Sequence, residues 1–235
     1  MLDPQPMVYK LREHLPIARE GRDPEGVHQL RVVSRRLRVF LELSGMRVLE
    51  DDLRWFRDAA QQARDIDVVQ QSSPPEPFGS WLETQRAPAR RRMLEALDDP
   101  RAKGLLEALS LLPPGDEATA RRAMAEIAEK VKKRAAVLYD EHAELEDLHR
   151  LRRGVRRLRY ALEWLDENAK PVKKVQDALG ELGDVRATFE LLDEFPRASE
   201  LEAYRRELWE HALGCRGRAL EAWQAVEQDV REMAK

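Results

Sequence analysis

The sequence predicts an all-α protein whose two halves share one plan, and three observations support this prediction. The composition combines 43% hydrophobic with 36% charged residues and only 6% aromatics, and glycine is scarce at 11 of 235 residues. No segment alternates apolar and polar residues as a half-buried strand would. Finally, an eleven-residue phrase with helical spacing occurs twice, 121 residues apart.

The first half is predicted to hold four main helices and one short one. A helix over residues 8–19 contains Pro16 as a candidate interruption. Asp23 and Pro24 then form a helix start, with Asp as the N-cap and Pro at the first helical position. That helix ends near Ser44-Gly45. Further helices are expected over residues 50–71, 80–97 and 102–111, with a proline-rich loop over residues 72–79.

Pro113-Pro114-Gly115 is the clearest break in the chain and divides it into residues 1–112 and 116–235. Asp116 is expected to cap a helix running to about residue 139. The next helix, which carries the second copy of the phrase, is expected to end near residue 167. Two further helices are expected over residues 172–192 and 199–233. The predicted fold is therefore two four-helix-type bundles, related by an internal duplication and a pseudo-twofold axis, that together form one domain.

Three matched landmarks support the duplication. The repeated phrase returns after 121 residues, Asp65 is matched by Asp184 after 119, and the segment that begins at Arg90 is matched by the one at Arg216 after 126. A nearly constant separation of similar segments is the sequence signature of an internal repeat.

The repeated phrase reads HQLRVVSRRLR from His28 to Arg38 and HRLRRGVRRLR from His149 to Arg159. Because a helix turns about 100° per residue, the His and three of the Arg residues of each copy fall within roughly 80° of one another. Leucine and valine occupy the opposite side of each copy. Neither copy contains an acidic residue, whereas an ordinary solvated face mixes charges through i,i+4 pairs. The pattern favours a basic stripe for an acidic partner, and an ordinary solvated face stays open as the alternative.

The positive charge is local. The formal net charge is −3, and the chain up to Gly115 has 18 basic and 18 acidic residues, against 23 and 26 after it. Arginine supplies 32 of the 41 basic residues, and its planar guanidinium binds phosphate or carboxylate oxygens in pairs.

These residues resemble the CHAD family, the conserved histidine α-helical domain. The two His-Arg helices, the segment Ala63-Arg64-Asp65-Ile66-Asp67 and the segment Leu158-Arg159-Tyr160 carry the resemblance. It implies a two-lobed helical bundle that binds inorganic polyphosphate through basic surfaces. In the second half Gly183-Asp184 replaces Arg64-Asp65, which departs from the family pattern.

On this basis we expect two tiers of polyphosphate contacts. The primary candidates are His28, Arg31, Arg35, Arg38, His149, Arg152, Arg156 and Arg159. The secondary candidates are Arg36, Arg153, Arg157, Arg90, Arg91, Arg92, Arg216 and Arg218. For the last five of these, an ordinary solvated surface is an equally good explanation. If the histidines contact phosphate, affinity should rise as the pH falls from about 8 to 6. A structural role and a metal pair remain open for them.

Asp65, Asp67 and Asp184 are expected to be structural, holding arginines and helix ends in place; a magnesium site is the alternative. Cys215 has no evident His/Asp partner that would make it a nucleophile. No carboxylate cluster, metal motif or phosphate-cradling glycine loop is visible. We therefore expect a non-catalytic protein without metal or cofactor.

The predicted function is polyphosphate binding, with targeting to polyphosphate granules. The alternatives are a binder of nucleic-acid backbones, disfavoured because no aromatic residues interleave with the arginines, and an accessory factor in polyphosphate metabolism. A single cysteine, the lack of a signal peptide and the lack of a membrane-spanning apolar stretch predict a cytoplasmic protein without a membrane partner. The sequence does not identify a protein partner.

Overall fold

The computed structural model describes residues 2–21 and 23–235. Their backbone is almost entirely helix and turn, and the one extended pairing among them is the bridge between Leu2 and Gly115. The all-α prediction is thus confirmed. The chain forms two compact units, Met1–Thr119 and Ala120–Lys235. No helix of the described residues is both long and apolar enough to cross a lipid bilayer.

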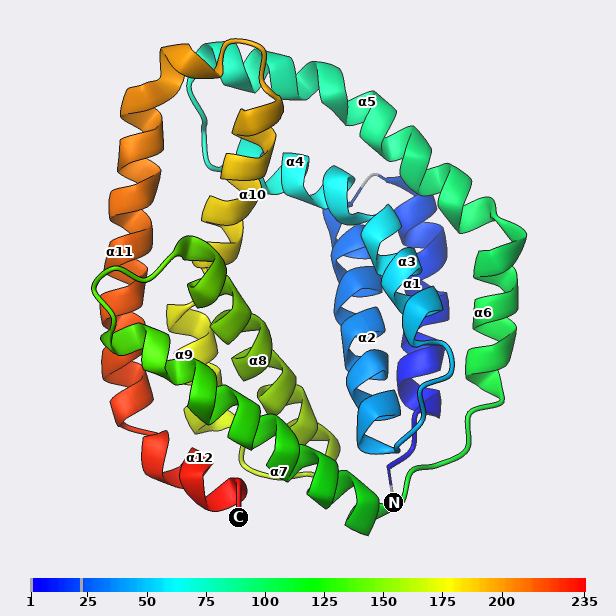
Figure 1. The fold of residues 1–235 in the computed structure, drawn as a ribbon. Helices are drawn as coiled ribbons and strands as arrows, with labels where there is room; N and C mark the ends of the chain where they lie inside the picture. The colour runs from blue at the N-terminus through cyan, green and yellow to red at the C-terminus, as the bar shows by residue number, and fades with distance from the viewer. Residues whose placement is uncertain (1, 22) are drawn as a thin grey trace. The chain divides into compact units, whose positions relative to one another are not determined.

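The first unit is built from a succession of helices (Figure 1): α1 (Gln5–Glu20), α2 (Pro24–Leu43), α3 (Glu50–Ala59), α4 (Gln61–Gln71), α5 (Glu76–Asp98) and α6 (Pro100–Ser110). The Asp23 side chain accepts a hydrogen bond from the Glu25 backbone N–H at 2.8 Å, so the predicted cap of α2 is present. Pro16 does not interrupt α1, which ends at Gly21 in a left-handed conformation with φ 66°.

Helix α2 is central to the first unit. It packs against α1, α3 and α4, and α1 runs beside it (Figure 1). Leu30, Val33, Leu37 and Phe40 on α2 are almost fully buried. The apolar side of the first phrase therefore faces the core, which leaves the arginines at the boundary with solvent.

The second unit continues the chain of helices: α7 (Glu117–Arg134), η1 (Ala135–Tyr139), α8 (Leu145–Trp164), α9 (Lys170–Ala178), α10 (Leu182–Glu194), η2 (Ala198–Leu201), α11 (Glu202–Gln224) and α12 (Glu227–Met233). Asp116 accepts a hydrogen bond from the Thr119 N–H at 2.8 Å, as expected of a cap. Helix α8 packs against η1, α9 and α10, and α11 packs against α9 and α10. Leu151, Val155 and Leu158 of α8 are buried.

Three of the expected long helices are each divided in two. The segment 50–71 turns at Ala60, the segment 172–192 turns around Gly180, and the segment 199–233 turns at Ala225-Val226. Ala60 is buried, and its N–H bonds to the carbonyl of Arg57 in a tight turn. Alanine favours helix, so the sequence has no signal for this turn; burial of Ala60 in the core overrides the propensity.

Candidate anion-binding stripes

Both copies of the repeated phrase lie wholly within single helices. We call His28, Arg31, Arg35 and Arg38 on α2 the α2 stripe, and His149, Arg152, Arg156 and Arg159 on α8 the α8 stripe. Except for Arg31, which is buried, their side chains are partly exposed. Each stripe is therefore a row of three arginines and one histidine at the edge of a core rather than on an open surface.

Arg31 is the most deeply placed cation of the α2 stripe, with 8% of its surface exposed. Burial lowers the pKa of Arg31 to about 10, while the nearby carboxylate of Asp65 opposes this shift, so the guanidinium stays charged at neutral pH. Its Nη1 is buried and has no hydrogen-bond partner among the described residues. A buried, charged donor without a partner is a strong candidate for an anion contact.

Arg152 occupies the corresponding place on the α8 stripe, where its guanidinium lies against Gly183 of α10. A Cβ atom at Gly183 would stand 2.5 Å from Cζ of Arg152, so glycine is what leaves room for the guanidinium. Burial lowers the pKa of Arg152, again opposed by a neighbouring carboxylate, that of Asp184. The buried Nε of Arg152 has no hydrogen-bond partner among the described residues.

The three aspartates singled out in the sequence lie beside arginines. Asp65 on α4 and Asp184 on α10 favour the charged forms of Arg31 and Arg152, respectively. Asp67 forms an ion pair with Arg86 of α5 at 3.3 Å. This arrangement fits the structural role expected of them, since each carboxylate faces a cation of its own unit.

Both stripe histidines are neutral in the ligand-free protein. Burial lowers the pKa of His28, helped by Arg64, Arg35 and Arg31 and opposed by Glu25. Burial lowers the pKa of His149 to about 3, helped by Arg186 and other neighbouring guanidiniums. The expected rise in affinity between pH 8 and 6 would thus require a bound anion to raise the pKa of His149 into that range.

Acidic residues approach the α8 stripe from both ends, although the phrase itself contains none. Glu146 forms ion pairs with Arg153 at 3.1 Å and with Arg186 at 3.8 Å. Glu163 pairs with Arg159 at 3.0 Å, and the Arg159 guanidinium stacks 4.9 Å over the Tyr160 ring. The Arg159 side chain is only 13% exposed. The end of the α8 stripe is therefore already occupied by internal contacts.

Most of the secondary arginines on α5 and α11 also have partners within their own unit. The contacts are Arg90 Nη2 to the Arg19 carbonyl (2.7 Å), Arg92 to the Gln62 side chain, Arg216 to the Asp140 carbonyl, and Arg218 Nη2 to Glu181 Oε2 (2.9 Å). Arg91 is exposed, and Arg36 and Arg157 are partly buried. These contacts tie α5 to α1 and α4, and α11 to the residues that follow η1 and precede α10, which gives four of these arginines a structural role whatever else they bind.

Two further arginines belong with the stripes although the sequence interpretation did not assign them. Arg64 on α4 is close enough to lower the pKa of both His28 and Arg31, and Arg186 on α10 lowers that of His149. Each stands next to, or two residues after, the aspartate that faces the stripe. That adjacency is the signal by which they could have been found.

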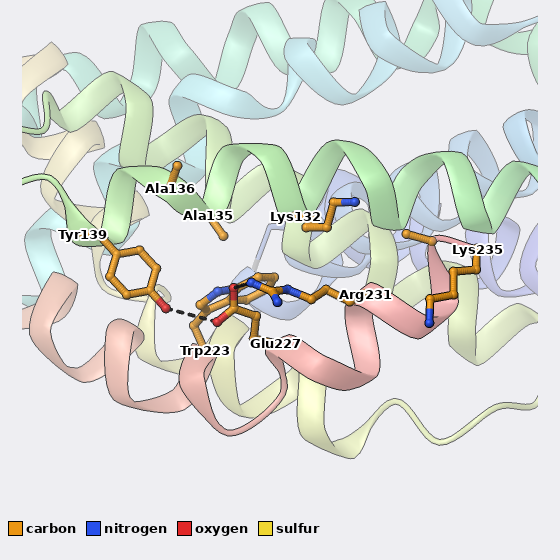
Figure 2. Close-up of a pocket in the computed structure, with 9 residues that line it drawn as sticks. Lys132, Ala135, Ala136, Tyr139, Trp223, Glu227, Arg231 and Lys235 are labelled. Atoms are coloured by element: carbon orange, nitrogen blue, oxygen red, sulfur yellow. Dashed lines mark hydrogen bonds and ion pairs between the residues drawn. The ribbon is translucent and has the colours of Figure 1, made fainter.

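A cavity of about 610 Å³ lies in the second unit (Figure 2). Its lining comes from the end of α7, η1, α11 and α12, and includes none of the stripe residues. Within it, Tyr139 donates a hydrogen bond to Glu227 at 3.2 Å, and Arg231 pairs with Glu227 at 2.8 Å. Tyr139, Glu227 and Arg231 thus pair with one another, whereas the buried indole N–H of Trp223 has no hydrogen-bond partner among the described residues.

The fold and the stripes together define a class: an all-α protein in which a His-Arg helix in each unit is backed by an aspartate from a neighbouring helix. The chain belongs to the CHAD domain family, whose sequence profile matches residues 5–193. The fold resembles the crystal structure of the CHAD domain from the plant Ricinus communis, with a TM-score of 0.66 and 25% identity, over 98% of this chain and 88% of that one.

A second solved structure has the same fold. PptA from Streptomyces chartreusis matches with a TM-score of 0.70 and 17% identity, over 94% of this chain and 96% of that one. A comparison with curated proteins gives no match. The family is therefore established by the sequence profile and the fold, and the ligand has to be argued from the residues.

Proposed function

We propose that this protein binds inorganic polyphosphate through the α2 stripe and the α8 stripe and catalyses no reaction on it. The observation that carries the proposal is Arg31, a buried and charged guanidinium whose Nη1 lacks a partner in the part of the chain that the structure describes. Polyphosphate is a chain of anions without bases to recognise, so its receptor needs rows of donors. Arginines on successive turns supply such a row, with about 5.4 Å between turns.

Membership of the CHAD family supports the choice of ligand, because the motifs that define the resemblance are the stripes themselves. Each stripe is complete within its own unit: cation row, supporting aspartate and apolar backing all come from that unit. The proposal therefore holds for each unit separately. Association with polyphosphate granules in the cell follows from it as part of the same proposal.

A binding role without catalysis agrees with how the carboxylates are used. Hydrolysis of a phosphoanhydride usually needs a metal held by several carboxylates near the phosphate. Here Asp65 and Asp184 face stripe arginines, and Asp67 pairs with Arg86. These carboxylates are therefore engaged in holding cations of the protein.

A titration with four polyanions tests the proposal. Long-chain polyphosphate, single-stranded RNA, duplex DNA and heparin are titrated at two salt concentrations, with orthophosphate release followed in parallel. We expect tight, salt-dependent binding of polyphosphate, much weaker binding of the other three and no release. Equal affinity for RNA would make the protein a general binder of phosphate backbones, and steady orthophosphate release would make it an enzyme; either result overturns the proposal.

A further inference from the structure

Three side chains of the types that bind transition metals converge where the start of α10 meets α11. Glu181 directly precedes α10, and His211 and Cys215 lie four residues apart on one face of α11. Glu181 Oε2 is 2.7 Å from His211 Nε2 and 3.5 Å from Cys215 Sγ. All three donor atoms lie within 4.8 Å of one another. The sequence interpretation left Cys215 without such partners: it overlooked His211, one helical turn earlier, and Glu181 is distant in the chain.

The spacing of these atoms is close to that of a zinc coordination shell. With Zn–N, Zn–O and Zn–S bonds of about 2.0–2.3 Å, neighbouring ligand atoms of a tetrahedral site are about 3.3–3.6 Å apart. The Glu181–Cys215 distance already fits this range. The side chains of His211 and Glu181 are about half exposed, so they can rotate to bring their donor atoms into this range. Cys215 is buried, so the position of its sulfur atom is fixed.

Arg218 supplies positive charge to the same place. Its Nη2 is 2.9 Å from Glu181 Oε2 and 3.2 Å from Cys215 Sγ, so one cationic group contacts two of the three donor atoms. The side chain of Arg218 is about half exposed and can swing into solvent. An arginine in this position performs the electrostatic task that a divalent cation would perform at the same atoms.

We propose that Glu181, His211 and Cys215 form a Zn²⁺ site, with Arg218 displaced when the metal binds. Thiol, imidazole and carboxylate donors together select zinc over magnesium or calcium, which prefer oxygen alone. The Cys215 thiol gives its proton to solvent as the Zn–S bond forms, and water takes the fourth position. The bound ion ties the start of α10 to α11. This proposal is independent of polyphosphate binding.

Cobalt titration of the full-length, metal-stripped protein tests the site, because Co²⁺ takes zinc's place and reports thiolate ligation by an intense near-ultraviolet charge-transfer band. We expect one equivalent of Co²⁺ to produce this band and Zn²⁺ to abolish it. Zn²⁺ should also raise the thermal midpoint, since a ligand that binds only the folded state stabilises it. Absence of the band in the wild-type protein would overturn the proposal.

Single substitutions identify which residues bind the metal. His211→Ala, at a half-exposed position where folding is not at risk, should weaken Zn²⁺ binding at least about tenfold, and Cys215→Ala should remove the band. Arg218→Ala should strengthen Zn²⁺ binding, because it removes the competing cation. His142→Ala, an exposed histidine of the same unit, is the matched control and should change nothing. Retention of the band in Cys215→Ala, or weaker binding in Arg218→Ala, would contradict the proposed geometry.

Discussion

The α2 stripe and the α8 stripe have the same sequence pattern but different surroundings. On α2, Arg31 is the buried cation, and Arg64 of α4 adds a further positive charge beside it. On α8, Arg152 rests on Gly183 of α10. Glu146 and Glu163 bring negative charge to the flanks of the α8 stripe. Glu25 and Glu42 occupy the same positions around the α2 stripe, and Arg186 adds positive charge beside the α8 stripe as Arg64 does beside the α2 stripe. The two stripes therefore differ in how their deepest arginine is seated, and not in the charge of their flanks.

This difference teaches that the seating of a stripe arginine depends on residues outside its helix. The residue before the supporting aspartate is arginine at position 64 and glycine at position 183. The first adds charge, whereas the second makes room for a guanidinium. In Arg31 the buried donor without a partner among the described residues is the terminal Nη1, whereas in Arg152 it is Nε. We therefore expect the α2 stripe to contribute more to polyphosphate affinity than the α8 stripe, and the following predictions test that ranking.

The largest expected effect comes from removing arginines of one stripe at a time. Arg31→Ala/Arg35→Ala should weaken polyphosphate binding at least about 100-fold, because two charge-assisted contacts contribute about 1.5–3 kcal/mol each. Arg152→Ala/Arg156→Ala should weaken it by about 10- to 30-fold, because Arg152 is less completely buried than Arg31 and water screens its contact with the anion more strongly. Isothermal titration calorimetry measures both.

The control for this pair removes two exposed arginines outside the stripes, in Arg47→Ala/Arg206→Ala, and thus the same net charge. It should cost less than about threefold in affinity, since exposed charges in water interact weakly. A control that weakens binding as much as the α2 pair would show that net charge, and not the stripe, decides affinity.

The supporting aspartates should differ in their effect on folding. Asp65→Asn leaves the buried Arg31 without its opposing charge and should lower the free energy of unfolding by about 2 kcal/mol, below the 3–5 expected of a fully buried pair. Asp184 is exposed, so Asp184→Asn should cost less than about 1 kcal/mol. Urea denaturation compares the two, and equal losses would refute the difference in burial on which the ranking rests.

Gly183→Ala tests whether the position of the Arg152 guanidinium against Gly183 matters for binding, without changing any charge. The added methyl group would meet the guanidinium at 2.5 Å and push it from its place. We expect polyphosphate affinity to fall about five- to tenfold, equivalent to a weakened charge-assisted contact. Gly217→Ala, with open space around its Cβ position, is the matched control and should leave affinity unchanged. Identical affinities in the two variants would remove Arg152 from the site.

The smallest effect concerns the histidines and pH. Because the pKa of His149 is lowered to about 3 in the folded protein, the unfolded chain binds the extra proton below its ordinary pKa of 6.5. Stability is therefore lost as the pH falls from 6.5 toward 3. Unscreened, the loss at pH 5 would be about 2 kcal/mol, and screening of this partly exposed group reduces it to about 1.

His149→Gln should flatten that pH dependence in denaturation curves recorded from pH 7 to 5. His28→Gln should flatten it less, since Glu25 partly offsets the lowering of the His28 pKa. A His149→Gln protein with the wild-type slope would mean that His149 is solvated rather than buried.

The sequence predicted the helical fold and the orientation of α2 and α8, because the spacing of Leu30, Val33 and Leu37 encodes burial directly. The turn at Ala60 escaped prediction because it depends on packing in the core rather than on a local breaker. The ion pairs of Glu146 and Glu163 with the α8 arginines, and the group around Cys215, also depend on tertiary proximity. The internal duplication stays a sequence-based prediction.

The central claim is that the arginine stripes bind polyphosphate, and one titration tests it most directly. Wild type and Arg31→Ala/Arg35→Ala/Arg152→Ala/Arg156→Ala are titrated with long-chain polyphosphate at low and high salt, and far-ultraviolet circular dichroism checks that both are equally helical. We predict a loss of affinity of at least about 1,000-fold in the variant and a much flatter salt dependence. A helical variant that retains wild-type affinity would contradict the account, because the ligand would then bind elsewhere.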